Sequence, residues 1–223
     1  MSSVSTRLLD HAEAVLFDLD GTLLDTARDL VNALHIVCSE EQQPAPDVAL
    51  AAQYVSTGAI GLVRLAFPGH DEAALELLRR RLVTTYEQNL CIHTAPYPGI
   101  NDVLDELDRA GVAWGVVTNK MKYLAEPILD HLDLLRRCAT VVGGDTAAQN
   151  KPHPAPIHFA LAAMRVKPDR AVYVGDAEKD IIAGKAAGTR TIAVTWGYII
   201  PGHDPYGWNA DYTIDEPKQL LNL

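Results

Sequence analysis

The chain has 223 residues, of which 48% are hydrophobic and 22% charged, and its formal net charge is −10. This composition is that of an ordinary globular protein and excludes a chain that is disordered throughout. The acidic balance argues against a nucleic-acid-binding protein, which needs a basic surface for phosphates. An anionic small ligand would therefore have to be held by local positive charges rather than by the overall field.

Cysteine usage and the N-terminal residues predict a reduced, cytoplasmic location. The three cysteines, Cys38, Cys91 and Cys138, are widely spaced and form no CxxC pair, so we expect packed free thiols rather than a disulfide framework. Residues 1–14 contain no apolar core of a signal peptide. No segment approaches the ~20 apolar residues that span a bilayer, so we expect no membrane partner.

The first predicted strand, residues 14–17, is followed by a region without a convincing strand. Four segments of helical periodicity fill residues 26–94 instead, and the last begins with Asp71 as a helix N-cap. We therefore expect residues 26–94 to form an inserted helical cap domain, and residues 1–25 and 95–223 to form the core.

Apolar runs and helical patterns alternate through the rest of the chain. The predicted strands are residues 112–117, 139–142, 171–174, 191–195 and 211–214. The predicted helices are residues 99–110, 121–136, 154–165 and 178–187. Alternation with short connections predicts an α/β fold with a Rossmann-like parallel sheet and helices on both faces. Ligands bind such sheets beyond the carboxyl ends of the strands.

Asp18 and Asp20 stand at the carboxyl end of the first predicted strand and are followed by Gly21. Taken alone, this motif is as compatible with a turn as with a catalytic site, because Asp-Gly is a strong turn dipeptide. A calcium-binding loop is excluded, since Leu23 stands where that loop requires a glycine.

Three later strand ends also carry polar residues. Thr118 and Asn119 follow one strand, Lys151 lies beyond the next, and Asp176 and Asp180 follow a third. Each has an ordinary structural explanation: turns and caps, a solvated lysine, or the acidic first turn of a helix. Together, however, the hydroxyl, amide and lysine would suit the oxygens of a phosphate.

A cation is needed if Asp18, Asp20 and Asp176 converge, because three carboxylates repel one another strongly. A site of oxygen ligands with few protein donors suits Mg²⁺, which keeps waters and shares substrate phosphate. Neither a G-x-G-x-x-G motif nor a G-x-x-x-x-G-K-[ST] motif is present, so dinucleotide and P-loop nucleotide sites are not supported.

The four motifs, in order, resemble those of the haloacid dehalogenase-like phosphatases. They are D18-L-D20-G-T, the strand ending in T118-N119, K151-P, and G-D176-x-x-x-D180, and they span nearly the whole chain. The inserted helices correspond to the first cap class of that family. Residues 143–156 and 185–199 are similar to bacterial phosphoglycolate phosphatases, whereas residues 196–217 also resemble phosphatases of N-acetylmuramic acid 6-phosphate.

The resemblance implies a role for each carboxylate. Asp18 would attack phosphorus and form an aspartyl-phosphate, and Asp20 would protonate the leaving alkoxide and then take a proton from water. Mg²⁺ would be held by the carboxylates of Asp18 and Asp176 and by the backbone carbonyl of Asp20. Asp180 would stand in the second layer and orient either the metal-bound waters or Lys151.

The resemblance also implies the groups that bind substrate. Thr118, Asn119 and the catalytic Lys151 would bind the phosphoryl oxygens. The cap would close over the substrate and contact it through the Ser56-Thr57-Gly58 stretch, with Arg64 either a further contact or a surface residue.

We therefore predict a Mg²⁺-dependent phosphomonoesterase that hydrolyses a small phosphorylated metabolite. The most favoured substrate is 2-phosphoglycolate, and N-acetylmuramic acid 6-phosphate or another sugar phosphate is the alternative. A phospho-acceptor signalling module is a hypothesis from another class, disfavoured by the long insertion and by Asp20. Asp20 also argues against dehalogenation, whereas a phosphomutase stays open. Neither the substrate nor the choice between monomer and homodimer follows from the sequence.

Overall fold

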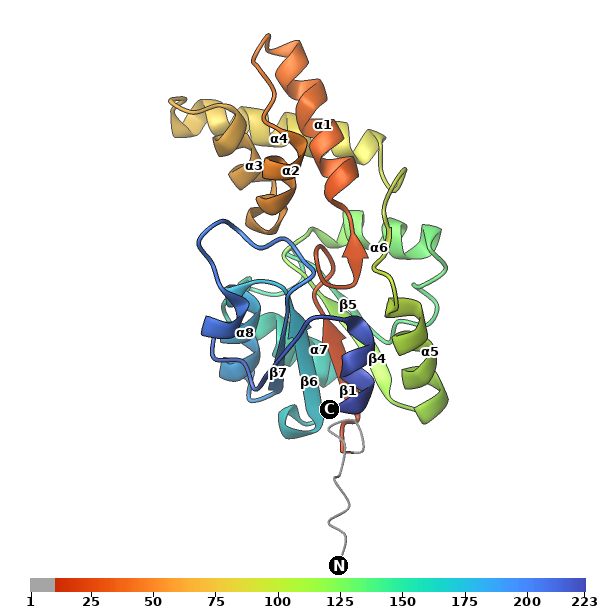
Figure 1. Cartoon of the computed structure of the whole chain (residues 1–223). Coiled ribbons are helices and arrows are strands. Elements are labelled where there is room, and N and C mark those ends of the chain that lie inside the picture. The colour runs from red at the N-terminus through yellow and green to blue at the C-terminus, as the bar shows by residue number, and fades with distance from the viewer. Residues whose placement is uncertain (1–10) are drawn as a thin grey trace, which may run out of the picture.

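The computed structural model describes residues 11–223, so most of the N-terminal segment in which we expect no signal peptide lies outside the described residues. Its main sheet contains β1 (Ala14–Phe17), β4 (Ala113–Val117), β5 (Val141–Val142), β6 (Ala171–Gly175), β7 (Arg190–Val194) and β8 (Tyr212–Ile214). The strand order is β5-β4-β1-β6-β7-β8, and every neighbouring pair is parallel. The predicted Rossmann-like α/β fold is therefore confirmed, with β1 at the centre between β4 and β6 (Figure 1).

Four helices cover the sheet: α5 (Ile100–Ala110), α6 (Lys122–His131), α7 (Ala155–Met164) and α8 (Glu178–Ala187). Alternate side chains of β1 point to opposite faces, as expected of a strand. Val15 and Phe17 belong to the hydrophobic cluster that contains the buried residues of α5 and α6, whereas Ala14 and Leu16 pack with α7 and α8. Residues 11–223 also contain the 3₁₀ helices η2 (Val55–Thr57), η3 (Pro168–Arg170), η4 (Pro205–Gly207) and η5 (Pro217–Asn222).

Helix α6 is shorter than its sequence pattern predicts. It ends at His131 rather than residue 136, because Asp133 takes a left-handed conformation with φ of 57°. The turn brings Leu134 back into the core, where its N–H donates to the Leu129 carbonyl at 2.8 Å. The apolar residues after His131 therefore pack as a turn and do not extend the helix.

Helices α1 (Ala27–Glu40), α2 (Val48–Gln53), α3 (Gly58–Ala66) and α4 (Glu72–Gln88) lie together beyond the carboxyl ends of the sheet strands (Figure 1). Residues 26–94 contain no strand, as the sequence predicts. The Asp71 carboxylate caps α4 by accepting from the Ala74 N–H at 2.8 Å. Burial of Leu75, Leu78 and Leu82 holds α4 against the other helices.

A short antiparallel pair, which the sequence does not predict, joins the helices to the sheet. In it, β2 (Leu24–Asp25) pairs with β3 (Ala95–Pro96). Just beyond the pair, the buried Asp29 of α1 accepts from the backbone N–H groups of His93 and Thr94 and from the Thr94 hydroxyl at 2.7 Å. The chain therefore enters and leaves the helical region at adjacent points.

The three cysteines are free thiols, as expected. Cys38 and Cys91 are buried and Cys138 is half-buried. Among the helices of residues 11–223, none combines the length and the apolar character that crossing a bilayer requires.

Candidate active site

Three predicted site residues stand at the carboxyl ends of neighbouring central strands. Asp18 follows β1, Thr118 follows β4 and Asp176 follows β6, and all three side chains are buried. The backbone N–H of Asp18 donates to the Val174 carbonyl at 2.9 Å, which extends the sheet pairing by one residue. Since parallel strands end at the same edge, the sheet itself brings these groups together.

Lys151 lies at the centre of this edge with a side chain that is wholly buried. Its Nζ is 3.0 Å from Asp18 Oδ1 and 2.7 Å from Asp180 Oδ1. It also contacts the Val117 carbonyl at 3.0 Å and the Tyr173 hydroxyl at 2.8 Å. Burial lowers the pKa of Lys151, but the charges of Asp18 and Asp180 outweigh this effect and hold the pKa well above its usual value. Lys151 is therefore a fixed cation beside Asp18.

The amide of Asn119 has a structural partner that the sequence does not predict. Its Nδ2 donates to the Lys151 carbonyl and its Oδ1 accepts from the Lys151 N–H, both at 3.0 Å. The two bonds hold the backbone of Lys151 in place. The neighbouring Thr118 hydroxyl accepts from the Lys120 N–H at 3.2 Å.

Carboxylate oxygens of Asp18, Asp176 and Asp180 lie within 4.8 Å of one another. Burial, together with the charges of Asp18 and Asp180, raises the pKa of Asp176 to about 8. Buried carboxylates crowded in this way are unfavourable unless a cation compensates them. An all-oxygen donor set of this kind fits Mg²⁺. The residues present therefore fit the Mg²⁺ that the sequence implies. Asp180 lies as near to Asp18 and Asp176 as a direct metal ligand would, and nearer than the second-layer role predicted for it requires.

Glycines allow the backbone to approach these carboxylates closely. Gly21 has a φ of +85°, and a Cβ there would lie 2.1 Å from Asp176 Oδ2. A Cβ on Gly197 would lie 2.3 Å from the Asp176 Cβ, and one on Gly175 would lie 2.4 Å from the Asp180 Cβ. Any side chain at these positions would displace the acidic cluster.

Asp20 lies apart from the acidic cluster. Its Oδ1 accepts from the Thr26 hydroxyl and from Lys120 Nζ, both at 2.6 Å. Lys120 also lies over the ring of Tyr86 in α4, with Nζ 4.8 Å from the ring centroid. Lys120 is a site residue that the sequence pattern does not single out, although it directly follows the Thr118-Asn119 pair.

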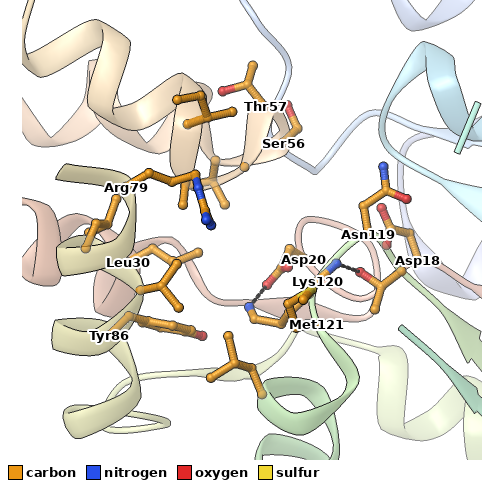
Figure 2. A pocket seen from close by; sticks show the side chains of 18 of the residues that line it. Asp18, Asp20, Leu30, Ser56, Thr57, Arg79, Tyr86, Asn119, Lys120 and Met121 are labelled. Carbon is orange, nitrogen blue, oxygen red and sulfur yellow. Dashed lines mark hydrogen bonds and ion pairs between the residues drawn. The ribbon is translucent and has the colours of Figure 1, made fainter. Parts of the chain in front are cut away.

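A cavity of about 300 Å³ lies between the strand ends and helices α1, α3 and α4 (Figure 2). The predicted residues Asp18, Asp20, Thr118, Asn119, Thr57 and Gly58 line it. The Thr57 hydroxyl donates to the Tyr54 carbonyl within its own turn. Of the two alternatives for Arg64, the structure agrees with the surface residue, because Arg64 does not line the cavity and forms an exposed ion pair with Glu72.

Ser56 joins the helical region to the other side of the cavity. Its carbonyl accepts from Lys179 Nζ at 2.6 Å, and its hydroxyl donates to the Tyr198 carbonyl at 3.0 Å. Tyr198 in turn donates its N–H to Asp176 at 2.8 Å and its hydroxyl to Asp25 at 2.7 Å. The helices are therefore closed over the strand ends in this structure.

The fold and this site define a class of enzyme, and comparison with known proteins agrees. The chain belongs to the haloacid dehalogenase-like hydrolases, because the model of that family matches residues 15–194. It is 42% identical over 207 residues to a phosphoglycolate phosphatase of Xanthomonas campestris pv. campestris (strain 8004), covering 93% of this chain and 94% of the relative. It is 37% identical over 212 residues to an N-acetylmuramic acid 6-phosphate phosphatase of Pseudomonas aeruginosa, covering 95% and 94%.

A solved structure has the same architecture. It is described as a predicted phosphoglycolate phosphatase from Haemophilus somnus 129pt and superposes with a TM-score of 0.86 at 25% identity. The similarity covers 95% of this chain and 97% of the solved one. It therefore includes the helical region as well as the sheet.

Proposed function

We propose that this protein is a Mg²⁺-dependent phosphomonoesterase that hydrolyses a small phosphorylated metabolite, most favourably 2-phosphoglycolate. One observation carries the proposal: Asp18, buried at the tip of the central strand, contacts the fixed cation Lys151 and belongs to a carboxylate cluster suited to a metal. A carboxylate in that position is a nucleophile for phosphorus.

Asp18 would attack phosphorus with Oδ2, because the Leu19 N–H and Lys151 both contact its Oδ1. The bond from phosphorus to the alcohol oxygen breaks as the Asp18–phosphorus bond forms, and Asp20 gives its proton to the leaving oxygen. Water then attacks the aspartyl-phosphate, Asp20 takes a proton from that water, and inorganic phosphate leaves. The Asp18 carboxylate is regenerated.

Positive charge and donors around Asp18 would stabilise the transferring phosphoryl group. The Thr118 hydroxyl and the Lys151 ammonium would bind its oxygens, and the Asn119 amide would keep Lys151 in place. Asp18, Asp176 and the backbone carbonyl of Asp20 would hold Mg²⁺, which when bound shields the charges of nucleophile and phosphate. Asp180 would orient Lys151.

We further propose that residues 26–94 act as a cap over a core formed by residues 1–25 and 95–223. The position of the cavity between the two regions supports this division, because substrate held there would be shielded from water. The single pair β2–β3, where the chain crosses twice, would serve as the hinge.

The activities named for the relatives favour two substrates. The phosphoglycolate phosphatases include the relative at 42% identity, and a cavity of about 300 Å³ is small for a ligand pocket, which favours the smaller ester. N-acetylmuramic acid 6-phosphate is the second candidate, because relatives of that name are 37% and 38% identical. Three free thiols fit the reducing cytoplasm as the site of action.

The test is hydrolysis of 2-phosphoglycolate and p-nitrophenyl phosphate in Mg²⁺, measured as release of inorganic phosphate. We expect a chelator to abolish turnover and Asp18→Asn to lower kcat by at least about 10⁴-fold, since removal of a nucleophile has effects of this size. Asp169→Asn, at an exposed aspartate of η3, is the matched control. Undiminished activity in Asp18→Asn, or indifference to the chelator, would refute the proposal. Ranking the esters by kcat/KM separates the two substrates.

A further inference from the structure

One face of α4 forms the wall of the cavity opposite Asp18. Arg79, Leu82, Val83 and Tyr86 line the cavity and follow one another at spacings of three, one and three residues, which places them on one side of a helix. The two apolar residues lie between a cation at one end and a hydroxyl at the other. The chemistry proposed above uses neither polar group.

The Tyr86 hydroxyl is a buried polar group whose proton has no acceptor among residues 11–223. The residue is 1% exposed, and the polar group that acts on its hydroxyl oxygen is the Lys120 ammonium, which can only donate. Burial raises its pKa to about 12, so the hydroxyl keeps its proton at neutral pH and can donate. A buried donor without a partner is unfavourable, and beside a cavity it is satisfied most directly by a ligand.

Arg79 extends from α4 towards the strand ends (Figure 2). Its Nε and one Nη2 proton donate to Glu76, at 2.6 and 2.8 Å. Glu76 also accepts from Arg80 at 2.8 Å, so the three residues together carry one net positive charge. An arginine has five N–H donors in a planar fork, and two are used here. The others can receive a planar anion.

The base of this part of the cavity holds the ion pair of Lys120 with Asp20, at 2.6 Å. Lys120 Nζ lies 4.8 Å from the Tyr86 ring centroid, and the acidic residues that line the cavity, Asp18 and Asp20, are both at the strand ends. A ligand with its phosphate at Asp18 would therefore meet donors and positive charge at its far end. This arrangement suits a second anionic group.

We propose that Arg79 and Tyr86 form a subsite for a carboxylate at the far end of the substrate from its phosphate, and that Arg79 determines this specificity. The inference rests on the proposed function and narrows its substrates to phosphomonoesters that carry a carboxylate. Guanidinium and carboxylate match as paired planar donors and acceptors. Both candidate substrates, 2-phosphoglycolate and N-acetylmuramic acid 6-phosphate, carry such a group, whereas most simple sugar phosphates do not.

The kinetic test compares 2-phosphoglycolate with 2-hydroxyethyl phosphate, in which a CH₂OH group replaces the carboxylate. In Arg79→Met the ratio of the two kcat/KM values should fall by roughly 10- to 100-fold, as expected for loss of a charged hydrogen-bonding partner. Arg79→Lys should retain part of the ratio, and Tyr86→Phe should lower it several-fold. Arg80→Met is the matched control, because Arg80 binds the same Glu76 but does not line the cavity; its ratio should not change.

A binding experiment keeps the inference separate from turnover. Calorimetry of the full chain with Mg²⁺ would compare 3-phosphonopropionate, a non-hydrolysable carboxylate-bearing probe, with propylphosphonate. Wild type should bind the first at least about tenfold more tightly, and Arg79→Met should lose this preference. Equal ratios in Arg79→Met and Arg80→Met, or no preference in wild type, would overturn the subsite. A preference without turnover of any ester would instead refute the proposed function and leave the subsite intact.

Discussion

The two sides of the cavity differ in how far their polar groups are paired within the protein. The strand-end floor comprises Asp18 and Thr118, which line the cavity, and Lys151, Asp176 and Asp180, which do not; Lys151 pairs with Asp18 and Asp180, and Thr118 and Asp176 bond to other protein groups. On the helical wall, formed by Arg79 and Tyr86 of α4, donors lack acceptors among residues 11–223. On the roles proposed above, the reacting groups would be held in place before the substrate binds, whereas the groups that recognise the rest of the substrate would gain their partners only when it binds.

Breaking the floor should have the largest effect on stability. Lys151→Met leaves Asp18 and Asp180 buried without their cation, so we expect the metal-free protein to lose about 3–5 kcal/mol of unfolding free energy. Urea denaturation measures this loss. Arg79→Met on the wall should cost less than about 1 kcal/mol, because its ion pair with Glu76 is partly exposed.

A second substitution tests whether uncompensated buried charge causes the loss of stability. Adding Asp180→Asn to Lys151→Met removes one of the uncompensated charges and should restore part of the lost stability. If Lys151→Met costs no more than Arg79→Met, the contrast between floor and wall is refuted.

The affinity for Mg²⁺ should depend on pH through the floor. The pKa of Asp176 is raised to about 8 by burial and by its neighbouring carboxylates, so the metal-free cluster carries a proton below that pH and must release it when the metal binds. Stability that the protonated carboxyl provides at low pH is lost as the pH rises through 8, and Mg²⁺ compensates for this loss. Calorimetry should show the dissociation constant falling by up to about tenfold per pH unit from pH 6 to 8 and levelling above. A constant value across this range would contradict the prediction.

Two tyrosines, one on each side, allow a closely matched comparison with the smallest expected effects on stability. The Tyr173 hydroxyl on the floor donates to the Val117 carbonyl and accepts from Lys151, both at 2.8 Å. Tyr173→Phe should therefore cost about 1–3 kcal/mol, since it leaves buried partners unsatisfied. Tyr86→Phe removes a hydroxyl whose proton has no acceptor among the described residues and should change stability by less than about 0.5 kcal/mol. Equal losses in chemical denaturation would contradict the comparison.

The floor could be predicted from the sequence because its residues directly follow strands. An apolar run ending in Asp18, and others ending in Thr118 and near Asp176, identify one edge of a parallel sheet, and the structure brings these side chains together. Lys151 was placed by its position beyond the next strand. The chemical roles given to these residues stay predictions, whereas the fold, including β8 near the C-terminus, is confirmed.

The wall could not be predicted in the same way. Arg79 and Tyr86 are seven residues apart on a helix, a spacing shared by many surface residues, and only the tertiary packing shows which face meets the cavity. Arg64 illustrates the problem, because it is close in sequence to Ser56-Thr57-Gly58 yet lies on the surface. The pair β2–β3 was missed because two-residue strands have no periodicity of their own.

That two-residue pair has a consequence for how such enzymes can diversify. Asp25 and Ala95 are paired neighbours and both exposed, so everything between them is, for the sheet, one loop that starts and ends at the same place. Exposed points with adjacent ends are where inserted segments are tolerated. A different helical segment could be grafted between these residues without changing the strand register that holds Asp18. The residues that hydrolyse the phosphate ester could thus be inherited unchanged while the helical segment, and with it the alcohol part of the substrate that is recognised, evolves separately.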